Sequence, residues 1–108
     1  MGLRSTALLL ILSGSLPAQV RDLRAFYRER CVVCHGADGT GRGPNGARLG
    51  GRNLTEARWQ ARREDAALVA SIQKGRGAMP GFGRQLPEPE ARRLVAEVIR
   101  PMAGRRKP

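Results

Sequence analysis

Two cysteines and the only histidine of the chain lie together in the segment Cys31-Val32-Val33-Cys34-His35. Residues three and four apart share one face of a helix, so both thiols and the imidazole would point to the same side. C-x-x-C-H is the attachment signature of a c-type haem, whose vinyl groups form thioethers with the two thiols while the histidine binds iron. We therefore expect one covalent haem c, bonded to Cys31 and Cys34, with His35 as an iron ligand.

Three alternatives use the same residues. A structural zinc site takes four ligands, typically Cys and His, and no further Cys or His follows His35, so zinc would need a carboxylate or a second chain. A thioredoxin-like redox pair belongs to a βαβ unit, and the sequence has no alternating strand pattern. The third alternative is a chance occurrence of the motif in an unrelated exported helix.

The N-terminal segment, residues 1–18, has the features of a secretory signal peptide. Arg4 supplies the positive charge, residues 7–12 the apolar stretch, and small residues follow, with cleavage after Ser15 or after Ala18. An uncleaved membrane anchor is the alternative, but the apolar stretch is far shorter than the roughly 18 to 20 residues of a spanning helix. The sequence therefore predicts export to the periplasm.

Of the 108 residues, 19–104 form one expected domain, and 105–108 form a basic C-terminal tail. A domain of this size is marginal without a cofactor or other support, and it has few aromatic residues to build a core. The net charge is +11, which reflects either a GC-rich genome or selection for a basic surface. In both cases we expect attraction to acidic proteins or anionic membrane surfaces. Nucleic-acid binding is a poor fit, because no groove-reading motif is present.

Apolar periodicity predicts an all-α fold of about four helices wrapped around the haem. The expected helices cover residues 20–34, 64–74 and 87–100, and a further short helix within 53–63 is expected to start near Thr55. Glycine-rich segments, 36–51 and 75–86, would join them as loops. A flexible linker is the alternative for 36–51, although Pro44 and Leu49 interrupt it. In the last helix, the core-facing stripe is expected to consist of Ala91, Leu94, Val95, Val98 and Ile99.

Several motifs in this order resemble the class I monohaem bacterial cytochromes c, over about residues 20–100. They are the haem motif continued as Cys34-His-Gly-Ala-Asp-Gly-Thr-Gly41, the Gly43-Pro44 step, the loop Gly77-Ala78-Met79-Pro80, and the closing helix from Leu86 to Arg100. The chain is similar in particular to small electron carriers and oxidase-subunit domains with a C-H-G-x-D-G-x-G start. The resemblance implies the cytochrome c fold.

The resemblance also implies that Met79 is the second axial ligand of the iron. Because His35 is the only histidine, two histidine ligands from one chain are excluded. Apart from Met79, the expected mature chain offers only Met102 as a thioether, and Met102 follows the apolar stripe, where packing or exposure is expected. The alternative is that Met79 only fills its loop, and that the iron is five-coordinate or binds an amine or water.

Four further residues are candidates around the haem. By resemblance, the backbone carbonyl of Pro44 accepts a hydrogen bond from the non-ligating ring nitrogen of His35, unless Pro44 is an ordinary turn proline. Trp59 either packs on the porphyrin edge, donates its indole N–H to a propionate, or simply packs in the core. Arg48 and Arg52 are candidates to neutralise the propionates, although any two arginines of this chain would serve.

The sequence departs from the family at the crossing of its first and last helices. An aromatic residue of the first helix usually packs against one in the last, and Tyr27 has Glu97 where the second aromatic is often found. Leu23 stands where a glycine commonly allows close crossing. We therefore expect this helix pair to be packed differently or more loosely.

An iron with both axial positions filled has no open site for substrate, so the expected function is one-electron transport rather than catalysis. Electrons would pass between periplasmic or membrane redox partners, which we expect to be acidic-faced proteins or membrane oxidoreductase complexes. The protein would be a monomer or a subunit. Two alternatives stay open: a haem subunit held permanently in a larger oxidoreductase, and an open-iron enzyme or gas sensor if Met79 is not a ligand.

Overall fold

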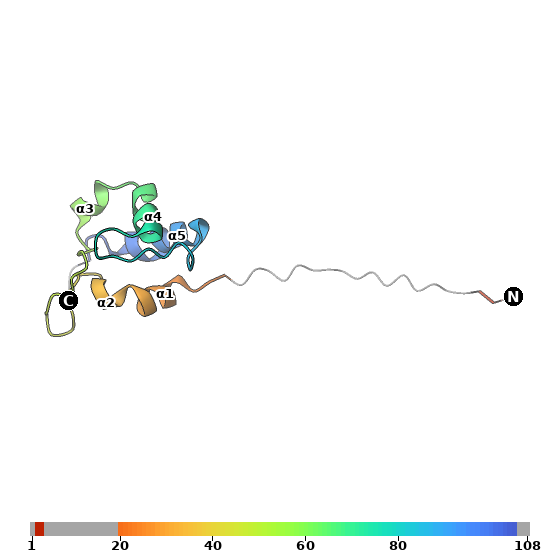
Figure 1. Ribbon diagram of the computed structural model, residues 1–108, viewed down its shortest axis with the longest axis horizontal. Coiled ribbons are helices and arrows are strands. Elements are labelled where there is room, and N and C mark those ends of the chain that lie inside the picture. Colours follow the sequence, from red (N-terminus) through yellow and green to blue (C-terminus); the bar gives the residue numbers. More distant parts are fainter. Residues whose placement is uncertain (1, 4–19, 106–108) are drawn as a thin grey trace.

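The computed structural model describes residues 2–3 and 20–105 (Figure 1). Apart from residues 2–3, the predicted signal segment lies outside the described residues, as do residues 106–108 of the predicted tail. The helices are α1 (Leu23–Arg30), α2 (Val32–His35), α3 (Ala57–Ala61), α4 (Asp65–Lys74) and α5 (Glu88–Leu94), followed by the π-helix η1 (Val95–Ile99) and the 3-10 helix η2 (Arg100–Met102). Among the described residues, extended pairing is confined to two isolated bridges. The predicted all-α fold is confirmed.

The first predicted helix is shorter at its start and divided near its end. The Asp22 side chain caps α1 by accepting a hydrogen bond from the Ala25 N–H at 3.1 Å, so the helix begins at Leu23 and leaves Val20 76% exposed. The helical period had placed Val20 on the same face as Leu23 and Tyr27, and this prediction is wrong because Val20 lies outside the helix. Cys31 separates α1 from α2, and Gly36, with φ +80°, ends α2.

The last helix forms the centre of the core. It begins after Pro87 as α5 and continues through η1. In Figure 1 the blue α5 lies between α4 and α1, and it packs against both. The predicted stripe is confirmed, because every member is buried: Ala91, Leu94, Val95, Val98 and Ile99.

The crossing of α1 with the last helix is closed by a residue from outside both. Phe26 of α1 meets Phe82 edge-to-face, with ring centroids 5.7 Å apart and planes at 85°, a favourable arrangement for aromatic pairs. Leu23 is buried in the crossing, and Glu97 forms an ion pair with Arg93 at 2.9 Å. The two helices are thus packed differently from the family pattern, as expected. The second aromatic residue, Phe82, comes from the loop after α4 and not from the last helix.

The glycine-rich segment after α2 folds back onto that helix. Gly41 donates its N–H to the His35 carbonyl at 2.7 Å, and Gly51 donates to the Cys34 carbonyl at 2.9 Å. These bonds anchor the segment at two points, so it is a structured loop rather than a flexible linker. Nowhere in the described part of the chain is a helix long and apolar enough to cross a membrane.

Candidate haem site

The two cysteines lie beside each other at the junction of α1 and α2. Both are free thiols and half-buried. Burial raises the pKa of Cys31 to about 11, with a smaller contribution from the charge of the neighbouring Cys34 thiolate. Surroundings that disfavour a thiolate suit an uncharged sulfur, and a thioether is uncharged. The environment of Cys31 therefore fits covalent attachment of an apolar group.

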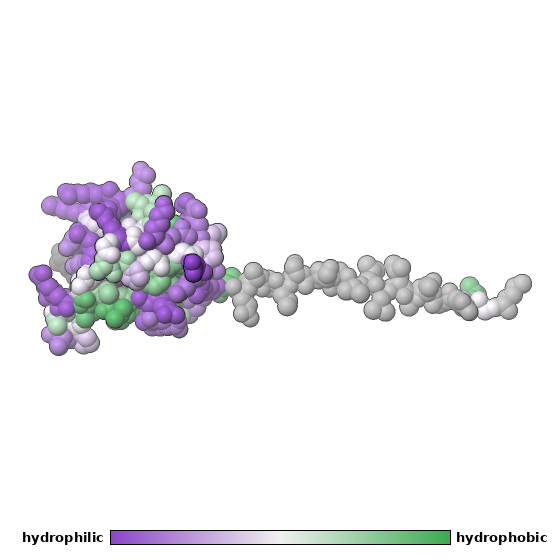
Figure 2. Space-filling view, viewed as in Figure 1, coloured by the Kyte–Doolittle hydropathy of each residue, from purple (hydrophilic) through white to green (hydrophobic). Residues whose placement is uncertain are grey.

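One of the two residues between the cysteines, Val33, lies on the surface. Its side chain is 72% exposed. Figure 2 shows hydrophobic surface gathered over α2, with hydrophilic surface around it. The attachment motif thus lies at the edge of the domain, where a bound porphyrin would have one margin near solvent.

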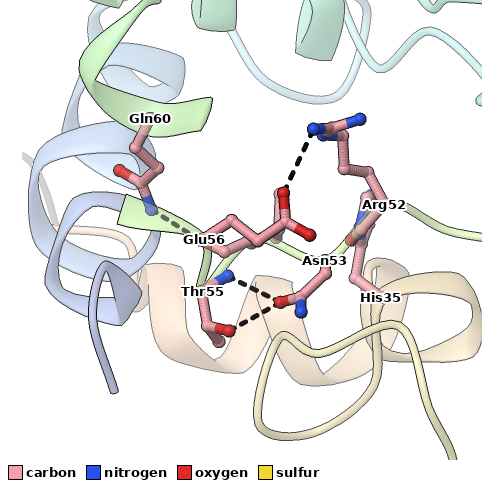
Figure 3. A network of polar contacts seen from close by, with 7 residues as sticks. His35, Arg52, Asn53, Thr55, Glu56 and Gln60 are labelled. Carbon is pink, nitrogen blue, oxygen red and sulfur yellow. Dashed lines mark hydrogen bonds and ion pairs between the residues drawn. The ribbon is translucent and has the colours of Figure 1, made fainter. Parts of the chain in front are cut away.

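The imidazole of His35 is oriented by a backbone carbonyl. Its Nδ1 lies 2.9 Å from the carbonyl oxygen of Arg52 (Figure 3). Because a carbonyl only accepts hydrogen bonds, the ring donates from Nδ1, and the lone pair of Nε2 is left for a metal. A contact of this kind fixes the ring and raises its basicity as a ligand.

This contact corrects the expectation for Pro44, since the acceptor is the carbonyl of Arg52. Pro44 is exposed in a turn in which Gly43 donates to Ala47 at 2.8 Å. Gly51 is the physical reason why Arg52 supplies the acceptor. A Cβ at Gly51 would lie 2.5 Å from the carbonyl carbon of Cys34. Only glycine lets the chain pass this close to α2 and bring the next carbonyl to the ring.

Met79 lies in a short loop that is tied to itself and to α4. Its N–H and carbonyl both pair with the backbone of Arg76, at 3.0 and 3.1 Å, and its side chain is half-buried against the core. Gly75, with φ +80°, makes the turn, and a Cβ there would lie 2.5 Å from the Met79 carbonyl oxygen. The backbone that carries the thioether is therefore fixed.

The other candidate thioether, Met102, packs in the core, which is one of the two placements expected for it. It is 4% exposed, and its sulfur lies against Gly39, where a Cβ would come within 2.5 Å of it. The structure therefore brings Met102 against the loop after α2, whereas Met79 stays in a separate loop after α4.

Trp59 lies between two guanidinium groups. Arg52 and Arg63 place their guanidinium carbons 4.7 and 5.1 Å from the centre of the Trp59 ring, within range of cation–π attraction. Arg52 also pairs with Glu56 at 3.3 Å (Figure 3). Arg63 was not predicted, although it follows Trp59 by four residues and so shares its helical face.

A cavity of about 540 Å³ adjoins this cluster and is lined by Arg52, Glu56, Arg58, Trp59, Arg62 and Arg63. Arg48 is not among these residues. It is exposed, and its backbone forms an isolated antiparallel β-bridge with Arg42. The indole N–H of Trp59 is buried and finds no hydrogen-bond acceptor among the residues that the structure describes. A buried donor without a partner is rare and is satisfied by a group that brings an acceptor. Beside several arginines, the anionic oxygens of a haem propionate fit that requirement.

Within residues 2–3 and 20–105, no group of three or more His, Cys, Asp or Glu side chains is placed to hold a metal ion. An all-helical domain with C-x-x-C-H at the junction of its first two helices, an oriented histidine and a half-buried thiol whose surroundings disfavour a charge defines the class of c-type cytochromes. Residues 18–96 match the family described as cytochrome c oxidase, cbb3-type, subunit III. The chain belongs to this family and is a cytochrome c electron-transfer domain.

Curated relatives agree with this assignment. The subunit FixP of the cbb3-type cytochrome c oxidase of Bradyrhizobium diazoefficiens is 34% identical over 80 residues, which is 73% of this chain and 26% of FixP. The subunit CcoP of Cereibacter sphaeroides is 32% identical over 74 residues, or 68% of this chain and 24% of CcoP. The chain thus spans about a quarter of the length of these relatives.

Solved structures give the fold. The KustC0563 c-type cytochrome matches with a TM-score of 0.66 and 32% identity, covering 77% of this chain and 99% of that one. The c-type cytochrome NirC matches with a TM-score of 0.58 and 26% identity, covering 75% and 89%. The predicted cytochrome c fold is confirmed.

Proposed function

We propose that the protein is an exported one-electron carrier of the periplasm. One haem c would be bonded to Cys31 and Cys34, with His35 and Met79 as the axial ligands of its iron. The observation that carries the proposal is the loop of Met79, in which two backbone hydrogen bonds to Arg76 fix the backbone that carries a half-buried thioether. A thioether held in this way is suited to stay bound, which would leave no position for a substrate.

Each residue has a separate task in this proposal. Haem c, when bound, supplies an iron that takes up or releases one electron, and methionine ligation favours its reduced state relative to two histidine ligands. The carbonyl of Arg52 holds the ring of His35 so that Nε2 is free. The Trp59 indole N–H and the guanidinium of Arg52 would bind the propionates.

The partners would be proteins with acidic faces or membrane oxidoreductase complexes. Three exposed cations lie before and after Met79 in the sequence: Lys74, Arg76 and Arg84. Long-range attraction to an acidic partner speeds encounter and is screened by salt. The electron-transfer rate with an acidic-faced partner should therefore fall as salt is added, and a rate insensitive to salt would contradict this part of the proposal.

A second candidate is a haem subunit held permanently in a larger oxidoreductase. The match to oxidase subunits FixP and CcoP favours it. Purification from native membranes distinguishes the two: a subunit co-purifies with a complex in fixed ratio after a high-salt wash, whereas a carrier is released.

Absorption spectra of the matured protein test the ligands directly. We expect a pyridine haemochrome typical of two thioether bonds, and a methionine–iron charge-transfer band in the ferric state. Met79→Leu should abolish the band with the haem still attached, whereas Met102→Leu, a matched loss of a buried thioether, should keep it. Loss of the band only in the second variant would make Met102 the ligand and refute the role of Met79. Ready cyanide binding by the unaltered protein would favour the open-iron enzyme or sensor.

A further inference from the structure

Gln60 is a buried polar side chain that the sequence did not assign to the site. It is 2% exposed. Its Nε2 donates to two backbone carbonyls, that of Leu54 at 2.7 Å and that of Ile99 at 2.8 Å. These two carbonyls belong to the segment before α3 and to the end of η1. One amide group therefore joins the last helix to the segment that follows the glycine-rich loop.

Arg100 strengthens the same junction from the end of the last helix. Its Nη1 donates to the backbone carbonyl of Gln60 at 2.7 Å, and its Nη2 donates to the carbonyl of Arg63. Its Nε donates to Asp65 at 2.9 Å, forming an ion pair. Because the guanidinium is a planar fork, it fixes several acceptors at once. Arg100 thus holds α3, which carries Gln60, against the last helix.

The segment 51–55 that Gln60 holds is also the one that reaches His35. Gly51 donates to Cys34, and Leu54 donates to the Gly39 carbonyl at 2.6 Å. In Figure 3, Gln60 and His35 lie at opposite ends of this segment, with Arg52 next to His35. The position of the Arg52 carbonyl is therefore set from one side by α2 and from the other by Gln60.

We infer that Gln60 and Arg100 are positioning residues for the iron ligand: they hold the Arg52 carbonyl at the distance at which it accepts from His35. This inference rests on the proposed function, in which His35 binds haem iron. The hydrogen bond makes the imidazole a stronger electron donor, which favours ferric iron. Loosening the segment weakens the bond and shifts the one-electron potential toward the reduced state.

The test uses the matured haem protein and the variant Gln60→Leu, which keeps the side-chain bulk and removes the donor. Since the chain has one histidine, ¹⁵N-histidine labelling gives a single Nδ1–H signal in the reduced protein. We expect about tenfold faster exchange of this proton with solvent. We also expect a positive shift of the potential equal to about a twofold change in the redox ratio, or about 18 mV.

Leu94→Ala is the matched control, because Leu94 is 1% exposed and its aliphatic side chain has no hydrogen-bond donor, so the change opens the core without removing a donor. It should lower stability without changing either readout, and equal changes in both variants would overturn the inference. If Gln60→Leu does not fold, Arg100→Lys takes its place and should give a smaller shift in the same direction. No change in either readout would refute it. A wild-type spectrum without His35 and Met79 ligation would refute the proposed function instead.

Discussion

Gly51→Ala is the most direct perturbation of the ligand geometry. The added methyl group would lie 2.5 Å from the Cys34 carbonyl carbon and 3.0 Å from the His35 nitrogen, whereas ordinary contact begins at 3.4 Å. The backbone at Gly51 must therefore retreat by about 1 Å, because the atoms of α2 that it meets are backbone atoms and do not yield.

That retreat is enough to break the contact that orients the imidazole. The distance from His35 Nδ1 to the Arg52 oxygen is 2.9 Å; a shift of about 1 Å takes it to about 3.9 Å, beyond hydrogen-bond range. We expect a loss of about 1–3 kcal/mol of stability from the strained packing. The potential should rise by up to about 59 mV, the value of a tenfold change for one electron.

Spectroelectrochemical titration and urea unfolding of the matured variant measure the two effects. Gly50→Ala is the control: Gly50 has φ +99°, but a Cβ there meets nothing within 4 Å. It should lower stability through backbone strain, by about 1–2 kcal/mol, and leave the potential unchanged. The reasoning is refuted if Gly51→Ala and Gly50→Ala have the same potential and the same Nδ1–H exchange rate.

Three further predictions concern the remaining residues of the site. Gly75→Ala should weaken the ferric methionine band, because its Cβ would lie 2.5 Å from the Met79 carbonyl oxygen, whereas Gly77→Ala, with nothing within 4 Å, should keep the band. Trp59→Phe keeps an aromatic ring but removes the buried N–H, which has no partner within the described part of the chain. If a propionate is its acceptor, the haem protein loses about 1–3 kcal/mol in thermal unfolding, and an unchanged midpoint would exclude that acceptor. Tyr27 donates to the buried Gly36 carbonyl at 2.7 Å, and burial raises the pKa of its phenol. The neutral phenol should therefore persist at about pH 11, where a free tyrosine is ionised, and no tyrosinate absorbance should appear.

The sequence predicted those features of the fold and the site that depend on residues close together in the chain. The spacing of Cys31, Cys34 and His35 and the stripe from Ala91 to Ile99 both depend on the helical period alone. The family match and the buried stripe confirm the fold that they indicated. In each case, residues a few positions apart carry the whole signal.

What the sequence did not predict depends on contacts between distant segments. The acceptor of His35 was expected at Pro44, but it is set by the close approach of Gly51 to α2, and nothing in a run of glycines marks which one is in contact. The pairing of Phe26 with Phe82 was missed for the same reason, since Phe82 lies in a loop with no period. No local pattern marks Gln60, because one of its two acceptors, the carbonyl of Ile99, lies 39 residues away in the sequence.

The segment between α2 and α4 affects the order in which parts of the protein unfold. Among the described core hydrophobics, Leu54 is the one that lies between Gly36 and Glu64. Regions with few buried apolar contacts open at lower free energy than the helices around them. The iron would therefore lose the partner of its histidine in a partial opening that leaves α1, α4 and α5 intact. Its colour and potential would report local melting before the domain as a whole unfolds.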